Sequence, residues 1–187
     1  MGAGKSTALE LLQELGAAVL STDAVVHELY EQSDMRAAVT ARWGAEVAPA
    51  GAVDRAAIAQ RAFSSEEDRR WLEETLWPLV GARVAAWLAD VRDQAAGTRP
   101  RAAIVEIPLL FEAGMEEVYD ATIAVVSGEE VRRERAGRRG HALADERAGR
   151  QLSQAEKARR ATFVVRNDGT REELRRELSA VLDKLAA

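Results

Sequence analysis

Apolar residues recur at helical spacing near the start of the chain and then give way to a short, wholly apolar run. The helical set is Ala8, Leu11, Leu12 and Leu15, and Gly16 follows in the position of a C-cap. Residues 17–20 are all apolar and lie between Gly and Ser, which predicts a buried strand. We expect Thr22 to cap a second helix over residues 23–32. This order of elements is typical of a crossover unit in an α/β fold.

Strand-like runs disappear between residues 33 and 96, where Ala, Arg, Glu and Leu dominate. The pattern predicts three to five helices, among them 34–43, 54–62, one that begins near Ser65 with an S-x-x-D cap, and a long last one that begins at Pro78. The block contains all four tryptophans of the chain, Trp43, Trp71, Trp77 and Trp87. We interpret them as the core of a helical subdomain. This interpretation is compatible with a subdomain that closes over a substrate.

Strand-like runs return after residue 96 and alternate with helical ones. The strands are predicted over 102–106, 121–126 and 162–165, and the helices over 129–138, 145–160 and 171–185. Strands that are apolar throughout and separated by helices indicate a parallel sheet covered on both faces. Ligands bind such sheets at the carboxyl ends of the strands.

Composition narrows the class of protein. The chain has 187 residues, of which 47% are hydrophobic and 30% charged, so it is long and apolar enough for a core with an inserted subdomain. It has no cysteine, which excludes a disulfide framework and thiolate metal sites and favours a cytoplasmic location. The net charge of −5 argues against a general nucleic-acid partner, and no apolar run is long enough to suggest a membrane partner.

The first seven residues contain the closing half of the phosphate-binding motif G-x-x-x-x-G-K-[ST]. Glycines let the backbone amides point at phosphate oxygens, lysine reaches the β- and γ-phosphates, and the serine hydroxyl holds Mg²⁺. The predicted ATP-binding residues are Gly2, Ala3, Gly4, Lys5, Ser6 and Thr7, with Ser6 as the metal ligand.

The first glycine of this motif, and the strand that normally delivers the loop, would precede Met1. We therefore expect Met1 to be an internal loop residue and the start codon to lie upstream. A version extended by about ten residues, enough for a strand and its turn, is expected to be more stable.

Two acidic residues follow predicted strands at their carboxyl ends. Asp23 can accept the proton of an attacking hydroxyl or help to hold Mg²⁺, and Glu106 follows the third strand. Residue type alone favours a different role for Asp23, that of complementing the dipole of its helix. His27, one turn further on, can orient Asp23 or the substrate, although a solvated helix histidine is the simpler interpretation. We expect Lys5, Ser6, Asp23 and Glu106 to converge on one crevice.

Arginines crowd one predicted helix and its exit, at positions 132, 133, 135, 138 and 139. Arg135 and Arg139 are four residues apart and share a face, so they can form a lid that neutralises a transferring phosphate. The alternatives are a surface helix paired with neighbouring glutamates, and an RNA-binding run that the acidic composition disfavours. Asn167-Asp168-Gly169 is a turn signal whose backbone groups are candidates to contact a nucleotide base.

Taken together, these motifs resemble the dephospho-CoA kinase family over essentially the whole chain. Its D-I-P-L-L-F-E motif is similar to the run from Glu106 to Glu112, and its D-A-D to Ser21-Thr22-Asp23. Arg135, Arg139 and Gln151 match the lid, and Asn167-Asp168-Gly169 matches an N-x-G turn near the base. The chain departs from the family pattern at Trp77, where a histidine is usual, and at Glu106 and Ser21, where aspartate is common.

The resemblance implies a P-loop NTPase-type three-layer sandwich that transfers the ATP γ-phosphate to the ribose 3′-hydroxyl of dephospho-CoA, with Mg²⁺, as the last step of coenzyme A synthesis. It implies that Asp23 is the base, that Lys5 bridges the phosphates, and that Arg139 with Arg135 clamps the transferring group. Asn167 and Gly169 would lie near the base.

The expected domains are a nucleotide-binding core (1–32 and 97–187, with a lid at about 132–150) and a helical acceptor-binding insert (33–96). The expected assembly is a monomer or small homo-oligomer. Another P-loop small-molecule or nucleotide kinase, and a truncated non-catalytic nucleotide-binding protein, stay open as alternatives.

Overall fold

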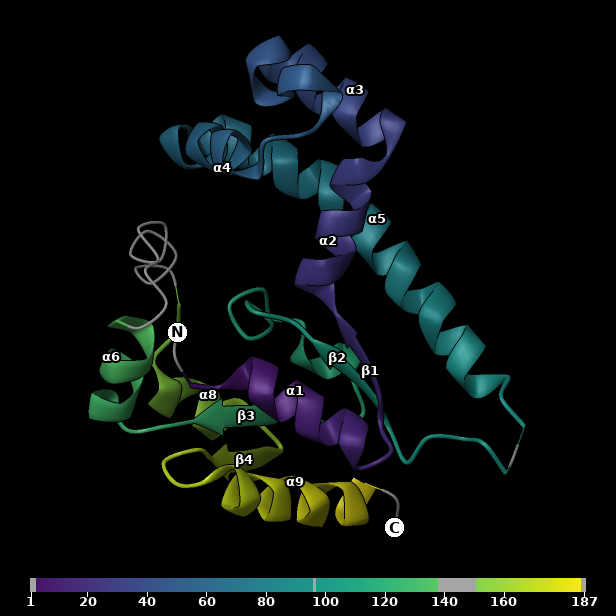
Figure 1. Cartoon of the computed structure of the whole chain (residues 1–187), viewed down its shortest axis with the longest axis vertical. Helices are drawn as coiled ribbons and strands as arrows, with labels where there is room; N and C mark the ends of the chain where they lie inside the picture. The colour runs from purple at the N-terminus through teal and green to yellow at the C-terminus, as the bar shows by residue number, and fades with distance from the viewer. Residues whose placement is uncertain (1–2, 96, 138–150, 186–187) are drawn as a thin grey trace. The chain divides into compact units, whose positions relative to one another are not determined.

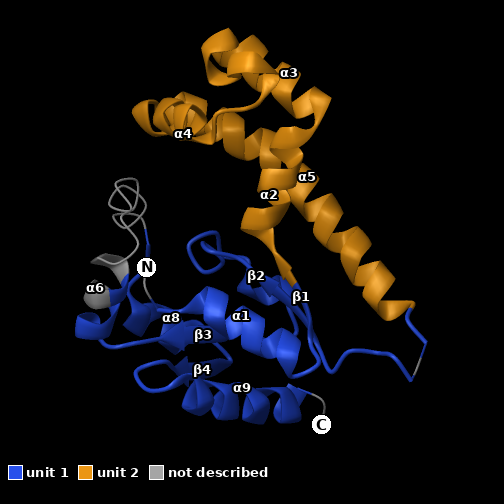
Figure 2. Cartoon of the chain, viewed as in Figure 1, with its two compact units in different colours: residues 1–19, 94–187 blue, residues 20–93 orange. Residues whose placement is uncertain are grey.

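The computed structural model describes residues 3–95, 97–137 and 151–185, and it divides the chain into two compact units (Figures 1 and 2). The first, here called the α/β unit, combines Met1–Val19 with Gln94–Ala187. The second, here called the helical unit, is Leu20–Asp93. We expected the insert to begin at residue 33, and that boundary stays a prediction; in the structure α2 (Thr22–Glu31) contributes Val25 and Leu29 to the core of the helical unit.

The α/β unit contains short strands that pair two by two, β1 with β2 and β3 with β4, and the helices that pack on them. Its elements are α1 (Lys5–Glu14), β2 (Ala103–Glu106), η3 (Glu116–Val118), β3 (Ile123–Val126), α6 (Glu129–Gly137), α8 (Gln154–Arg160), β4 (Phe163–Arg166) and α9 (Arg171–Leu185). β3 pairs with β4 in parallel, with Ile123 opposite Phe163. β2 pairs with β1 (Ala18–Ser21), the strand that carries the chain into the helical unit. All the predicted strands are thus present within a residue or two.

The core of the α/β unit lies between the strands and two helices that come from opposite ends of the sequence. α1 and α9 pack side by side (Figure 1) and bury Leu11, Leu178 and Leu182 completely. Val165 of β4 is buried against them. The helical period of leucine and valine along α9 places these residues on one face, as the sequence predicted.

Replacing Leu178 with alanine is expected to destabilise the protein by about 2–5 kcal/mol, because the side chain is fully buried and its removal leaves a cavity in the core. Denaturant unfolding followed by circular dichroism measures this change. Arg176→Ala, on the exposed face of the same helix, is the control and should alter stability by less than about 0.5 kcal/mol. Equal losses in the two variants would contradict the assigned core.

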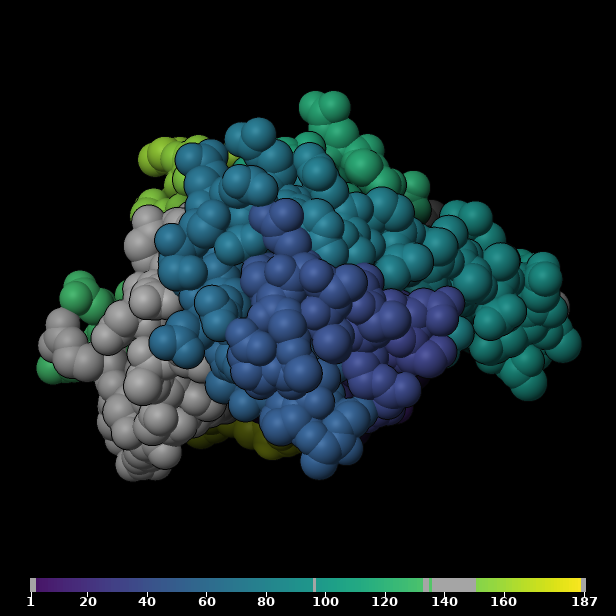
Figure 3. All heavy atoms as spheres, turned by 90° about the horizontal axis from the view of Figure 1, so that it is seen from above, coloured from purple at the N-terminus to yellow at the C-terminus, as the bar shows by residue number. Residues whose placement is uncertain are grey.

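The helical unit is built on one long helix. Its elements are α2, α3 (Ser33–Trp43), η1 (Ala45–Val47), η2 (Pro49–Gly51), α4 (Arg55–Ser64) and α5 (Glu66–Arg92). Figure 3 shows this unit from above, with α5 (teal) extending beyond the shorter helices (blue). Val39, Val47 and Ile58 are buried at its centre.

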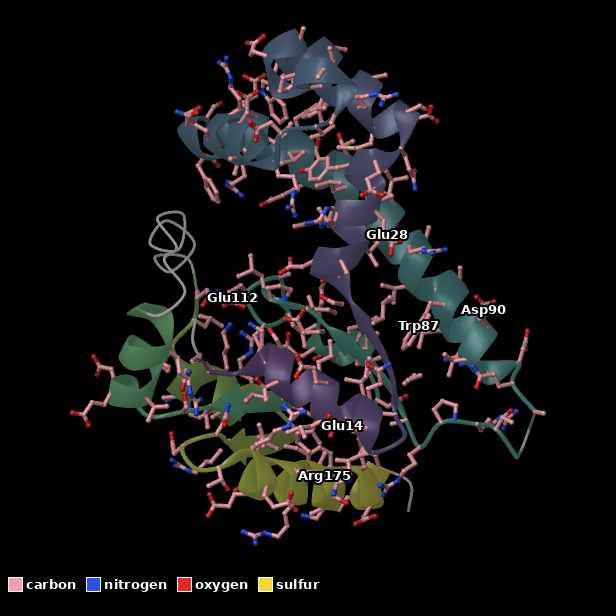
Figure 4. The ribbon with its side chains drawn as sticks, in the orientation of Figure 1. Glu14, Glu28, Trp87, Asp90, Glu112 and Arg175 are labelled. Carbon is pink, nitrogen blue, oxygen red and sulfur yellow. The ribbon has the colours of Figure 1, made fainter. Side chains whose placement is uncertain are left out.

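Two of the four tryptophans belong to this core. The rings of Trp43 and Trp71 meet edge to face, with centroids 5.0 Å apart and planes at 81°. Trp77 is 60% exposed, so its predicted place in the core is wrong. Trp87 lies on the C-terminal half of α5 and is half-buried (Figure 4).

Three of the predicted helix boundaries differ from those in the structure. Pro78 does not begin a helix: α5 runs through it, because Leu76 and Val80 on either side pack against the same core. Thr22 is not a cap, since α2 starts at Thr22 itself and no side chain caps it. Of the helix predicted over 145–160, residues 145–150 lie outside the described residues and α8 begins only at Gln154, where Ser153 caps it by accepting a hydrogen bond from Glu156.

The predicted cap of α5 is confirmed. The Ser65 hydroxyl accepts a hydrogen bond from the backbone N–H of Asp68 at 3.2 Å. The Asp68 carboxylate binds the Arg42 guanidinium of α3, and this pairing lowers the pKa of Asp68. The S-x-x-D pattern therefore both starts α5 and ties it to α3.

Candidate active site

The phosphate-binding motif forms the N-terminus of α1. Gly4 is the N-cap residue and adopts the left-handed conformation (φ 85°, ψ 29°), which glycine tolerates best. The first intrahelical hydrogen bond runs from the N–H of Ala8 to the carbonyl of Gly4 at 3.0 Å, so the three preceding amides of α1 make no such bond. The first turn has neither an acidic residue nor a side-chain cap. This helix end is therefore suited to an anion.

Lys5 and Glu106 meet at this end of α1. The ammonium Nζ of Lys5 lies 3.8 Å from the carboxylate Oε1 of Glu106, at the carboxyl end of β2. Lys5 is 43% exposed and Glu106 17%, so the lysine can leave its partner to reach a ligand in solvent. The topology thus brings together two of the residues that we expected to converge, and Ser6 is exposed beside Lys5 in the first turn.

Asp23 and His27 belong to the helical unit. Asp23 is exposed in the first turn of α2. His27 is one turn further along, and its Nδ1 lies 3.1 Å from Nη1 of Arg55. A guanidinium only donates, so Nδ1 of His27 is the acceptor of this bond. His27 therefore pairs with α4, and its expected role in orienting Asp23 stays a prediction.

Asn167, directly after β4, joins three segments of the α/β unit. Its side-chain amide donates a hydrogen bond to the carbonyl of Ala3 at 2.8 Å. Its backbone N–H donates to the carbonyl of Val126 at the end of β3. Its own carbonyl accepts a hydrogen bond from Nη1 of Arg135, on α6, at 3.0 Å. Asn167 is only 6% exposed.

Arg135 lies next to the phosphate-binding loop as a result of this arrangement. A β-carbon on Gly4 would lie 3.7 Å from Nη1 of Arg135 and 2.0 Å from the side-chain nitrogen of Asn167. The loop thus requires glycine at this position for space as well as for conformation. Gly2 and Arg139 lie outside the described residues, so their expected roles stay predictions.

Gly169 and its neighbours form the start of α9. The Glu173 carboxylate accepts hydrogen bonds from the N–H and the hydroxyl of Thr170, and these backbone and side-chain bonds lower the pKa of Glu173. A side chain on Gly169 would collide with this carboxylate. The exposed Glu173 side chain could move to relieve this contact, and the expected contact of Gly169 with a base stays a prediction.

The segment after β2 is tied to α8 by two acid–base pairs that the sequence did not reveal. Glu112 (Figure 4) lies 2.8 Å from Nζ of Lys157 and accepts the N–H of Leu152 at 2.9 Å. Glu116 pairs with Arg160, whose guanidinium also lies over the ring of Phe111. The only signal in the sequence is the spacing of the two basic residues, which places them on one face of α8.

Glu112 gives this junction a dependence on pH. Burial alone would raise the pKa of Glu112, but hydrogen bonds from Lys157 and from backbone N–H groups outweigh it and hold the pKa below its ordinary value. The stabilisation is therefore present above the unfolded-state pKa of about 4.3 and is lost as the pH falls through the lower folded-state pKa.

Glu112→Gln is expected to cost about 1–3 kcal/mol of stability near pH 7, because it removes hydrogen bonds to a charged group. The variant and the unaltered protein should converge in stability in acid, since the carboxyl is then protonated in both states. Urea unfolding at a series of pH values measures this. Glu117→Gln, on an exposed neighbour, should show no such convergence.

No group of three His, Asp or Glu side chains within the described residues is placed to hold a metal ion. A Mg²⁺ ion accepts one or two protein ligands when substrate phosphates and water complete its octahedron, and the exposed Ser6 hydroxyl next to the anion-ready end of α1 fits that requirement. Among the described helices, none combines the length and the apolar character that crossing a membrane requires.

Sequence comparison gives a consistent result over the whole chain. The family model described as dephospho-CoA kinase matches residues 1–173. A dephospho-CoA kinase from Deinococcus radiodurans is 39% identical over 189 residues, which cover 99% of this chain and 88% of the relative. One from Anaeromyxobacter dehalogenans is 42% identical over 176 residues, or 91% of this chain and 82% of the relative.

Solved structures agree with this fold. A crystal structure of a Thermus thermophilus protein superposes with a TM-score of 0.82 at 34% identity and covers all of this chain and 94% of its own. A dephospho-CoA kinase from Campylobacter jejuni, 23% identical, has a TM-score of 0.69 and supports the fold alone.

Proposed function

The chain belongs to the dephospho-CoA kinase family, whose reaction is the ATP-dependent phosphorylation of dephospho-CoA in coenzyme A biosynthesis, and we propose that the loop that begins α1 is where this chain performs it. A new bond forms between the acceptor's ribose 3′-oxygen and the γ-phosphorus, the bond from that phosphorus to the β-bridging oxygen breaks, and CoA and ADP result. The observation that carries the proposal is the uncapped, acid-free end of α1 with Lys5 and Arg135 beside it.

Each element of this loop has a separate task in phosphoryl transfer. The amides at the start of α1, with those of Gly2 and Ala3, cradle the β- and γ-phosphates, and Thr7 completes the turn. Lys5 leaves Glu106 and bridges the phosphates. Arg135, with Arg139, neutralises the charge that develops on the transferring group. Ser6 holds Mg²⁺, which when bound shields the phosphate charges from the incoming hydroxyl.

Asp23 is proposed as the base that receives the acceptor's hydroxyl proton. Asp23 is exposed in the first turn of α2, and a carboxylate is among the groups that take such a proton in phosphoryl transfer. The helical unit that carries Asp23 then serves to bind the acceptor. Its length, with α5 alone spanning 27 residues, suits an acceptor larger than a simple sugar acid.

The setting of the enzyme is proposed as cytoplasmic, in line with its lack of cysteine, and its assembly as a monomer or small homo-oligomer. Its proposed partners are small molecules, ATP and dephospho-CoA, with neither nucleic acid nor membrane among them.

The test is ADP production by the purified chain with Mg²⁺ and one acceptor at a time. Dephospho-CoA should stimulate ADP formation, and adenylate, shikimate and gluconate should not. Stimulation by one of the other acceptors would favour a different P-loop kinase activity. Binding of ATP without stimulation by any acceptor would favour a non-catalytic nucleotide-binding protein.

A further inference from the structure

We propose that the side chain of Asn167 is a positioning group for the phosphate-binding loop, and that it acts on the phosphates of the nucleotide and not on its base. The inference rests on the proposed function, because it assumes that the loop at Gly4 binds phosphates. The sequence placed Asn167 in a turn near the base. The contacts of its side-chain amide support a different role.

The amide of Asn167 fixes the orientation of one peptide group in the loop. It donates to the carbonyl of Ala3 at 2.8 Å. In a trans peptide the carbonyl of one residue and the N–H of the next point in opposite directions. Holding the Ala3 carbonyl therefore turns the N–H of Gly4 away from Asn167, to the side of the loop left for a ligand.

Asn167 is itself held rigidly enough to do this. It is 6% exposed, and its backbone N–H donates to the Val126 carbonyl at 2.8 Å. The carboxylate of the next residue, Asp168, accepts the N–H of Gly128, which follows β3. The turn after β4 is thus fastened to the end of β3, so the amide presents a fixed donor to the loop.

The same residue positions the arginine. Nη1 of Arg135 donates to the backbone carbonyl of Asn167 at 3.0 Å, while the Asn167 side chain lies against Gly4. Asn167 therefore contacts both the phosphate-binding loop and the Arg135 guanidinium, and it holds the two close to each other. Substituting the side chain releases the loop but leaves the backbone carbonyl for Arg135 in place.

The experiment compares the affinities of ADP and of inorganic tripolyphosphate, measured by isothermal titration calorimetry on the full chain with Mg²⁺. Asn167→Asp keeps the shape but replaces the donor with an acceptor, and Asn167→Ala removes the group. Both variants should bind the two ligands more weakly by one common factor of about 2–10, the equivalent of a lost hydrogen bond. Glu172→Gln, at an exposed position in the first turn of α9, is the control and should change neither affinity by more than twofold.

The alternatives give different results. If Asn167 contacts the base, its substitution should weaken the binding of ADP and leave the binding of tripolyphosphate unchanged. If its role is purely structural, substitution should lower the thermal midpoint of unfolding and leave both affinities unchanged. Either outcome overturns the proposal. An unaltered protein that binds neither ligand would refute the proposed function itself, which separates that failure from a failure of the inference.

Discussion

Replacing Asp23 with asparagine is expected to lower the turnover number by about 100- to 10,000-fold, the contribution typical of a general base. Asparagine has the size and hydrogen-bonding reach of aspartate but cannot take a proton from the acceptor hydroxyl. The phosphate-binding loop belongs to the other unit of the chain, so the affinity for ATP should change little. Steady-state kinetics with dephospho-CoA as the varied substrate, together with calorimetric titration of ATP, measures both quantities.

Asp34 provides a matched control for this experiment. It is also an exposed aspartate in the first turn of its helix, α3, and it also complements a helix dipole. Asp34→Asn should leave turnover within about twofold, because it loses only an exposed charge and the asparagine oxygen can still accept the hydrogen bond from the Ser33 hydroxyl. Equal and small effects of the two substitutions would show that Asp23 merely stabilises its helix, the alternative that the sequence left open.

Replacing Lys5 with methionine is expected to lower turnover by about 100- to 1,000-fold, the usual cost of removing one preorganised charge or donor at a transferring group. Methionine keeps the length of the side chain but loses the ammonium. It also leaves Glu106 at the end of β2 without this cation, so a negative charge then faces the phosphates. The affinity for ATP should therefore fall as well, in contrast to the Asp23 variant.

The control for Lys5 is Lys184→Met, which removes the same group from the exposed last turn of α9. It should leave both turnover and ATP affinity unchanged. A second variant, Lys5→Met with Glu106→Gln, separates the two causes. It should regain part of the ATP affinity if repulsion by Glu106 contributes, and none of the turnover. Full activity of Lys5→Met alone would exclude the proposed role of the loop.

The elements that could be predicted from the sequence are those specified by local pattern. α9 has the predicted bounds because leucine and valine recur at helical spacing on one face of a charged helix. The phosphate-binding loop was predicted because its glycine, lysine and serine are consecutive. The prediction at Pro78 was wrong for the same reason: proline favours a first turn locally, but Leu76 and Val80 on either side of it pack against one core and α5 continues through it.

The parts that the sequence could not reveal depend on long-range contacts. The amide of Asn167 reaches the carbonyl of Ala3 across 164 positions, and no spacing rule connects two such residues. Glu112 and Lys157 are similarly remote, and their charges alone are indistinguishable from those of a solvated surface. Trp77 was expected in the core on residue type, yet its place on α5 leaves it 60% exposed.

The pairing of α1 with α9 has a consequence for the order of events on the ribosome. α1 is synthesised well before α9, and it buries Leu11 against Leu178 and Leu182 of that later helix. A nascent chain released from the tunnel up to β3 still lacks both this hydrophobic partner and Asn167. The ability to hold a nucleotide should therefore arise only after β4 and α9 have left the ribosome, and until then the apolar face of α1 lacks its native partner.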